Sequence, residues 1–131
     1  MRKAILMLLL AVGSSGAAAE WVEVRGPESE TFTVYADSAT IRKVGTVVKM
    51  WSLYDYKALH VTPVLSPYMS MTKQYEYDCK EERQRTLFWS SYSGQMSRGI
   101  VVQTDTDPNN WSPVAPGTVG EQLWQLACGK R

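Results

Sequence analysis

The two cysteines, Cys79 and Cys128, carry the clearest chemistry in this sequence. Redox-active pairs favour a Cys-x-x-Cys spacing, whereas these two lie 49 positions apart. If the chain is exported to an oxidising compartment, exactly one pair of cysteines predicts a structural disulfide. Closing a loop of that size would stabilise the fold by about 4 kcal/mol in the chain-entropy treatment.

His60 is the only histidine and lies in a segment, Lys57–Pro67, that contains two prolines and has no sustained period. We interpret this segment as a loop. The histidine would serve as a general base, or as a haem ligand with Met69 or Met71 as its partner, although a solvated loop histidine is the commoner case. A small periplasmic enzyme or inhibitor that uses this loop is therefore an alternative function.

Other polar clusters fall short of a catalytic or metal-binding set. The neighbouring serines lack the glycine pattern of a nucleophile elbow; they are Ser90, Ser91 and Ser93. Asp105, Asp107 and Asn109 lie at alternate positions, as the first ligands of a calcium-binding loop do. The twelfth position of that run holds Pro116 in place of a bidentate glutamate, so turn chemistry explains it better. We predict no enzyme activity, no metal and no cofactor.

The first 19 residues have the layout of a cleavable signal peptide. Met1, Arg2 and Lys3 are followed by an apolar run and then by small residues up to Ala19, which predicts cleavage before Glu20. The apolar run is shorter than the roughly 20 residues of a membrane span, and no lipid-attachment cysteine lies near the cut. We expect a periplasmic or secreted protein with no membrane span or lipid anchor.

The remaining chain, residues 20–131, is predicted to form a single domain. Without Arg2 and Lys3 it carries 12 basic and 13 acidic residues. This near-neutral balance, with no basic run among aromatics, argues against a nucleic-acid partner.

Alternating patterns predict about six antiparallel strands with local connections. The expected strands are Trp21–Val24, Thr31–Ala36, Thr46–Tyr56, Met69–Asp78, Thr86–Tyr92 and Ile100–Thr104. The clearest alternation places Tyr75, Tyr77 and Cys79 on one side of a hairpin. A single helical turn is predicted at Asp37–Ile41, because Asp37 can cap exposed backbone amides.

A C-terminal helix is predicted after Thr118, which forms a capping box with Glu121. Its apolar stripe consists of Val119, Leu123, Leu126 and Ala127. Cys128 lies beside the stripe, so a disulfide to Cys79 would fix this helix to the sheet. The predicted fold class is α+β, with the helix packed on one face of the antiparallel sheet.

Two groups of side chains are candidates for binding a protein partner. Large aromatic residues occupy both faces of long strands, more than one helix can cover; they are Trp51, Tyr54, Tyr56, Phe88, Trp89 and Tyr92. The densest basic cluster flanks the hairpin turn and consists of Lys80, Arg83 and Arg85. The competing interpretations are loops that cover the aromatic residues and a solvated turn of mixed charge.

Four runs of this chain resemble the surface-adhesin protein E-like family of small exported bacterial proteins. They are Lys49–Tyr56, Gln74–Arg83, Ser91–Gly94, and Gly117–Glu121 with Ala127–Lys130. The resemblance implies a six-stranded antiparallel sheet with a C-terminal helix tied by a disulfide at Cys79 and Cys128. It also implies adhesion, because the family's namesake adheres to host extracellular-matrix proteins. This chain departs from that pattern by lacking a lipid-attachment cysteine at its export signal.

We therefore expect a non-enzymatic exported binding or envelope-associated module, with an adhesin-like role in binding an unknown protein. Besides the enzyme or inhibitor built on the loop around His60, the other alternative is a self-associating structural protein, suggested by the excess of aromatic residues.

Overall fold

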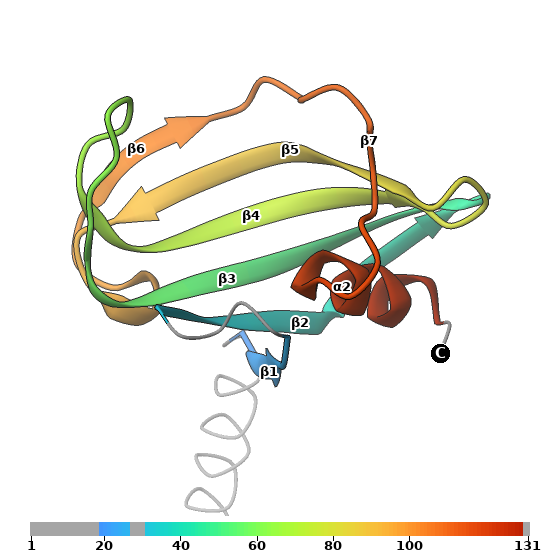
Figure 1. Cartoon of the computed structure of the whole chain (residues 1–131), viewed down its shortest axis with the longest axis horizontal. Helices are drawn as coiled ribbons and strands as arrows, with labels where there is room; N and C mark the ends of the chain where they lie inside the picture. Colours follow the sequence, from blue (N-terminus) through green and yellow to red (C-terminus); the bar gives the residue numbers. More distant parts are fainter. Residues whose placement is uncertain (1–18, 27–30, 130–131) are drawn as a thin grey trace, which may run out of the picture.

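The fold is an antiparallel sheet whose strands stand side by side in chain order (Figure 1). The computed structural model describes residues 19–26 and 31–129. The six strands are β1 (Val22–Val24), β2 (Phe32–Val44), β3 (Val47–His60), β4 (Tyr68–Asp78), β5 (Arg83–Tyr92) and β6 (Val101–Asp105). A two-residue strand, β7 (Ser112–Pro113), pairs with the start of β5. The prediction of about six antiparallel strands with local connections is confirmed.

The helix α2 (Val119–Cys128) begins directly after Thr118, as the sequence predicts. The Thr118 hydroxyl accepts a hydrogen bond from the amide of Glu121 at 3.2 Å. The Glu121 carboxylate in turn accepts from the amide of Gly117 at 3.1 Å. Gly129 ends the helix with a φ of 69°, a left-handed conformation that glycine adopts without strain.

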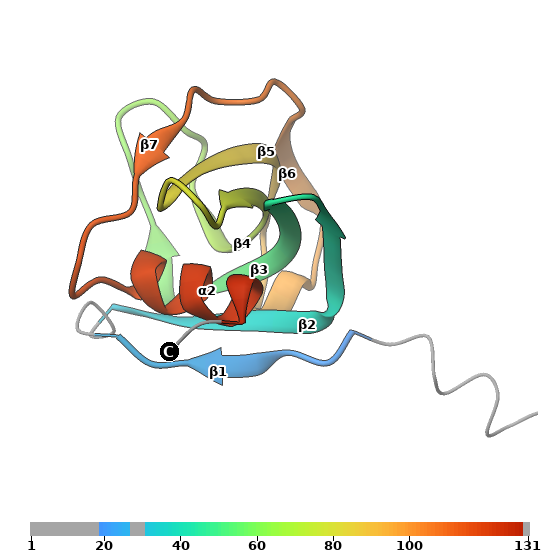
Figure 2. The same ribbon diagram turned by 90° about the vertical axis from the view of Figure 1, so that its right-hand side faces the viewer.

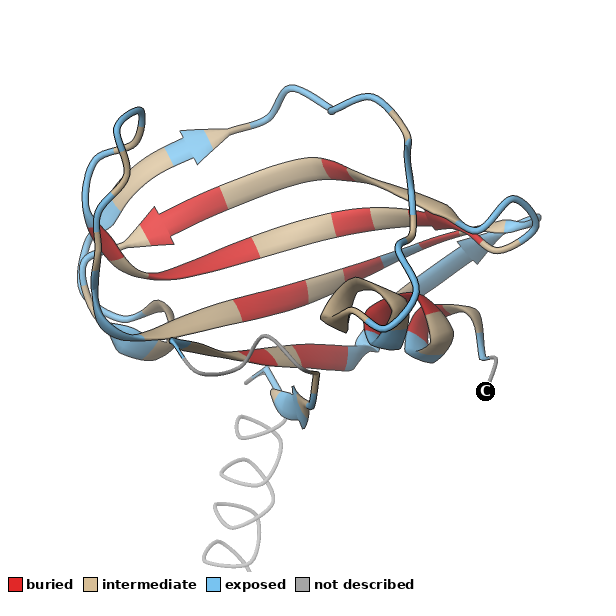
Figure 3. Ribbon diagram, in the orientation of Figure 1, coloured by how far each residue is buried: buried red, intermediate tan, exposed pale blue. Residues whose placement is uncertain are grey.

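The hydrophobic core lies between α2 and the middle strands. Leu123, Trp124 and Ala127 are the buried residues of the helix. They pack on alternate residues of β2, β3 and β4, which are Val34, Ala36, Val48, Met50, Tyr75 and Tyr77. The buried positions, red in Figure 3, follow these strands and the helix. We call this side of the sheet the helix face.

The opposite side of the sheet, which we call the outer face, carries the alternate residues of the same strands. The strand register places Asp37, Trp51, Gln74 and Phe88 in one row across β2, β3, β4 and β5. Figure 2 shows the sheet curling from β2 to β5, with α2 lying within the curve. The outer face is therefore the side that the helix leaves open.

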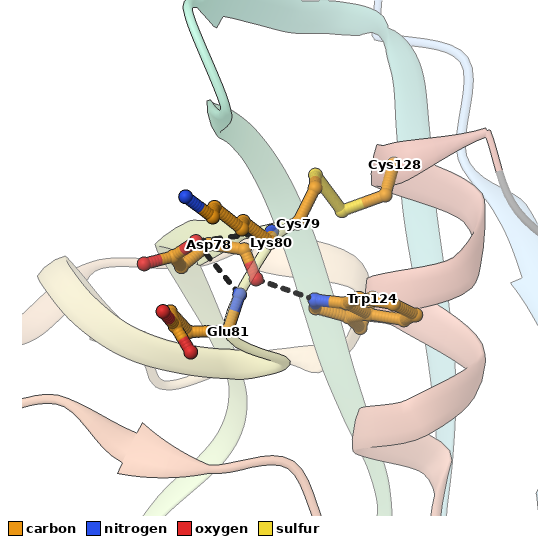
Figure 4. Close-up of a disulfide and its surroundings, with 6 residues drawn as sticks. All are labelled: Asp78, Cys79, Lys80, Glu81, Trp124 and Cys128. Atoms are coloured by element: carbon orange, nitrogen blue, oxygen red, sulfur yellow. Dashed lines mark hydrogen bonds between the residues drawn. A yellow bond between two sulfur atoms is a disulfide. The ribbon is translucent and has the colours of Figure 1, made fainter.

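A disulfide between Cys79 and Cys128 ties the end of the helix to the hairpin that follows β4 (Figure 4). The two Cα atoms are 5.6 Å apart. Next to the bond, the indole N–H of Trp124 donates to the carbonyl oxygen of Asp78 at 3.0 Å. The predicted covalent link between helix and sheet is confirmed.

The predicted helical turn at Asp37–Ile41 is wrong, because strand β2 continues through this segment. The pairing of β2 with β3 shifts register between Asp37 and Arg42. Within the irregularity, Asp37 accepts from the amide of Ala39 at 3.1 Å, which satisfies the local backbone as a cap would. The Thr40 hydroxyl accepts from the amide of Trp51 at 3.0 Å and so bridges β2 and β3.

The predicted loop at Lys57–Pro67 is shorter than expected, because β3 extends to His60. His60 pairs with Tyr68 across the connection. Its ring stacks on Tyr56, with centroids 4.3 Å apart, and meets Tyr68 edge-on. These ring contacts give a short-range reason for the strand to continue past the expected turn.

The outer face is partly covered at the end of the sheet distant from the disulfide. The short 3-10 helix η1 (Gln95–Ser97) follows β5 and contacts β3 and β4. The amides of Met96 and Ser97 donate to Asp55 and Ser70, at 2.7 and 2.9 Å.

None of the helices in residues 19–26 and 31–129 is long and apolar enough to span a bilayer. Residues 1–18 of the predicted signal peptide lie outside the part of the chain that the structure describes.

Candidate functional site

Half-buried aromatic rings lie on the outer face between β3 and β5. Trp51 and Phe88 lean toward each other across β4, with ring centroids 5.5 Å apart in an edge-to-face arrangement. Beside them, the hydroxyls of Thr72 and Tyr92 lie 3.2 Å apart and share a hydrogen bond. This part of the face therefore combines ring surface with hydroxyl groups.

These rings line an open hollow of about 370 Å³. Trp21, just before β1, is among the residues that line the hollow. Asp37 and Ala19 contribute to the wall, so a carboxylate lies beside the aromatic rings. The hollow combines a mainly apolar lining with a few polar groups, which is the usual composition of a recognition pocket.

A β-bulge in β5 determines which further residues reach the outer face. The pairing runs from Gln74 with Phe88 directly to Tyr75 with Thr86, so Leu87 is the extra residue. A bulge of one residue reverses the alternation of side chains beyond it. Because of this reversal, Arg85 lies on the same face as Phe88.

Arg83 and Arg85 lie side by side on the outer face, and a carboxylate on β4 holds each of them. Arg83 Nε is 3.0 Å from Asp78 Oδ2. The guanidinium of Arg85 is 2.7 Å from Glu76 Oε1. Both guanidinium groups lie against the ring of Trp111, with Cζ 4.8 and 4.7 Å from the ring centroid. We call these five residues the arginine–tryptophan ladder.

The carboxylate of Asp78 accepts several hydrogen bonds that hold the ladder together. The amides of Glu81 and Lys80 both donate to Oδ1 at 3.1 Å, and Arg83 donates to Oδ2. The Glu81 amide, with the Arg83 guanidinium and the Lys80 amide, lowers the pKa of Asp78 below its ordinary value of 3.8. The carboxylate therefore remains charged at neutral pH and keeps Arg83 in place.

A second hollow, of about 400 Å³, adjoins the ladder. Its lining includes Arg83, Trp111 and Glu81, together with Ser112 and Pro113 of β7. The ring of Trp111 thus contacts both arginines and also borders an open hollow. Tryptophan and arginine are the side chains most enriched where proteins bind one another tightly.

The structure separates the binding residues that the sequence suggested. Trp51, Arg83 and Arg85 share the outer face, whereas Tyr54 and Tyr56 lie on the helix face.

The two helix-face tyrosines already have partners inside the protein. The hydroxyl of Tyr54 is 2.9 Å from that of Tyr75, and Tyr56 packs on Phe32 with ring centroids 5.4 Å apart. Burial raises the pKa of both Tyr54 and Tyr56 above the ordinary value. Lys80 lies exposed in the turn between β4 and β5, outside the ladder.

His60 lies at the end of β3 distant from the disulfide, stacked on Tyr56 as described above. No group of three or more His, Cys, Asp or Glu side chains suited to a metal ion occurs in residues 19–26 and 31–129.

Sequence reasoning missed Trp111 and Trp21 as members of the site. Trp111 lies in a segment whose Asp, Asn, Pro and Gly content indicates only a connecting loop. A large aromatic residue alone in such a loop is a usable signal, because it must pack on something distant in the sequence. The register of β5, and with it the partner of Trp111, depends on a bulge that no pattern predicts.

These features define a class of small α+β domain, with an antiparallel meander, a terminal helix tied to it by a disulfide, and an outer face that the helix leaves open. A family model described as "Surface-adhesin protein E" matches residues 21–129. The chain therefore belongs to the surface-adhesin protein E family, and the suspected resemblance is confirmed.

Solved structures of Haemophilus influenzae protein E share this fold. One superposes with a TM-score of 0.60 at 16% identity, covering 82% of this chain and 83% of that chain. A selenomethionine form gives a TM-score of 0.60 at 15% identity, covering 86% of this chain and 92% of that chain. At these identities the likeness concerns the fold alone. No curated protein matches the chain significantly.

Proposed function

We propose that this protein is a non-enzymatic exported module that binds another protein through the outer face of its sheet. Membership of a surface-adhesin family supports an exported or surface location and an adhesin-like role. We choose this face because Trp111 contacts both Arg83 and Arg85 there, beside an open hollow.

The ladder is suited to binding because its side chains are held in place before a partner arrives. Each arginine is fixed by a carboxylate and by the indole, so little side-chain freedom remains to be lost on association. The guanidinium N–H groups that are not used in these ion pairs can donate hydrogen bonds to carbonyl or carboxylate oxygens of a partner. The indole supplies apolar area at the same place.

The charges of the ladder cancel, because two arginines face Asp78 and Glu76. A neutral surface gives weak long-range attraction, so the affinity should depend little on salt. A partner that bound chiefly through a basic patch would instead dissociate as the salt concentration rises.

In this proposal residues 1–19 are a signal peptide that is removed, and residues 20–131 act as one domain. The protein then functions in the periplasm, in the cell envelope or outside the cell. Lys80, exposed beside the ladder, would extend the contact surface at its edge.

The test is binding of the purified protein to a panel of extracellular-matrix proteins, measured by biolayer interferometry. Trp111→Ala should weaken a saturable interaction by tenfold or more, as expected for a central tryptophan. Leu126→Ala is the matched control, because Leu126 is an apolar helix residue that is 40% exposed. Equal loss in both variants, or binding to no panel member, would count against the proposal.

Self-association is measured in the same samples by light scattering. If the protein forms dimers that Trp111→Ala dissociates, the outer face joins copies of this chain in place of a foreign partner.

A further inference from the structure

Asp37 is a buried carboxylate at the edge of the outer face. The residue is 5% exposed and lines the hollow with Trp21 and Trp51. Its Oδ1 accepts from the amide of Ala39 at 3.1 Å. No lysine or arginine in residues 19–26 and 31–129 forms an ion pair with it, unlike Asp78. A buried carboxylate without a cation is costly, so a positive partner would stabilise the fold.

The atom that faces the other oxygen of this carboxylate is the backbone nitrogen of Glu20. Glu20 N is 3.4 Å from Asp37 Oδ2. Glu20 is also the first residue after the predicted signal-peptide cut. Before cleavage this nitrogen belongs to a neutral amide with one hydrogen.

Cleavage changes the charge of this nitrogen. Hydrolysis of the Ala19–Glu20 peptide bond consumes one water molecule and leaves a carboxylate on Ala19 and a protonated α-amine on Glu20. An α-amine has a pKa of about 7.7–8.0, so it is mainly charged at neutral pH. The new ammonium has three hydrogens and lies within ion-pair distance of Asp37 without any movement of the chain.

We propose that Asp37 is a binding site for the new N-terminus, so that signal-peptide removal creates a partly buried ion pair between the Glu20 ammonium and the Asp37 carboxylate. The pair fixes the start of β1, a three-residue edge strand, onto β2. It also holds Trp21 in the wall of the hollow. Ala19, which lines the hollow before cleavage, departs with the signal peptide and opens that side.

This inference rests on the proposed cleavage after Ala19 and is independent of any partner. Intact mass of the exported protein gives the N-terminal residue. A mature chain that starts elsewhere overturns the inference, and leaves the binding proposal for the outer face untouched.

The energetic test compares four purified proteins in a double-mutant cycle. They start at Glu20 or retain Ala19, and each carries either Asp37 or Asp37→Asn. With Asp37, the chain that starts at Glu20 should have an unfolding equilibrium constant about tenfold smaller than the extended chain. With Asp37→Asn the two chains should have equal unfolding equilibrium constants, because the side-chain oxygen of asparagine still accepts a hydrogen bond from the Ala39 amide but carries no charge. A difference of the same size in both backgrounds contradicts the proposal.

A chemical measurement tests the contact itself. The α-amine of the mature protein should react slowly with an α-amine-selective aldehyde, and Asp37→Asn should accelerate that reaction severalfold. Glu20→Ala is the control, since it keeps the ammonium and removes only the exposed side chain; it should remain as slow as the parent. Fast reaction of the parent protein overturns the proposal even if Asp37→Asn fails to fold.

Discussion

The indole N–H of Trp124 donates to the carbonyl oxygen of Asp78, 46 positions earlier in the chain, at 3.0 Å. The residue after Asp78 is Cys79, which forms the disulfide to Cys128 (Figure 4). On its other side, the carboxylate of Asp78 holds Arg83 in the ladder. One short segment thus connects the helix, through a hydrogen bond and a covalent bond, to the proposed contact surface.

Replacing both cysteines, Cys79→Ser with Cys128→Ser, should destabilise the protein strongly. The disulfide joins residues 49 positions apart. Closing a loop of that size lowers the entropy of the unfolded chain, which stabilises the folded state by about 4 kcal/mol. Denaturant unfolding of the variant and of the parent protein measures the loss. Reduction of the parent should lower its melting temperature to that of the variant; an unchanged melting temperature would show that the bond contributes little.

Trp124→Phe should cost about 1–3 kcal/mol, because the indole hydrogen bond to the carbonyl of Asp78 is lost. The ring remains, so most of the packing of α2 on the sheet is kept. Leu126→Ala, at a partly exposed position of the same helix, should change stability by less than about 0.5 kcal/mol. Urea unfolding compares the two, and equal effects would argue that the hydrogen bond is unimportant.

Asp78 should make the free energy of unfolding depend on pH in the acidic range. Its pKa in the folded protein lies below the ordinary value of 3.8, chiefly because the Glu81 amide donates to the carboxylate. The stabilisation is therefore present above about pH 4 and is lost as the pH falls through the folded pKa. Asp78→Asn should flatten this part of the stability profile, measured as the urea midpoint against pH. A parallel decline in both proteins would contradict the assignment.

Three of the seven tyrosines should fail to ionise normally at alkaline pH. Burial raises the pKa of Tyr54, Tyr56 and Tyr77 above 10.0. A phenol whose pKa is raised by folding stabilises the fold below its unfolded pKa, and this contribution is lost as the pH rises further. Near-ultraviolet phenolate absorbance should show these three ionising only together with unfolding. Reversible ionisation of all seven before unfolding would be inconsistent with their burial.

Much of the fold could be predicted from local patterns. Alternation along β4 predicted that Tyr75 and Tyr77 lie on one side, and both do contribute to the core. The capping box at Thr118 fixed the start of α2, because its chemistry involves only residues three positions apart.

The errors have tertiary causes. Asp37 has the chemistry of a helix cap, yet the pairing of β2 with β3 keeps the segment extended. The extra residue at Leu87 places Arg85 on the same face of the sheet as Phe88, and nothing in the alternation marks it. Trp111 could not be assigned a partner, since its contacts with Arg83 and Arg85 depend on how the segment after β6 returns to β5.

The most direct test of the outer face as a contact surface is hydrogen exchange of the protein with and without a bound partner. We predict that binding protects residues 83–88 and 105–113, which carry and surround the arginine–tryptophan ladder. Protection confined to α2, with those segments exchanging at the same rate in both states, would contradict the account.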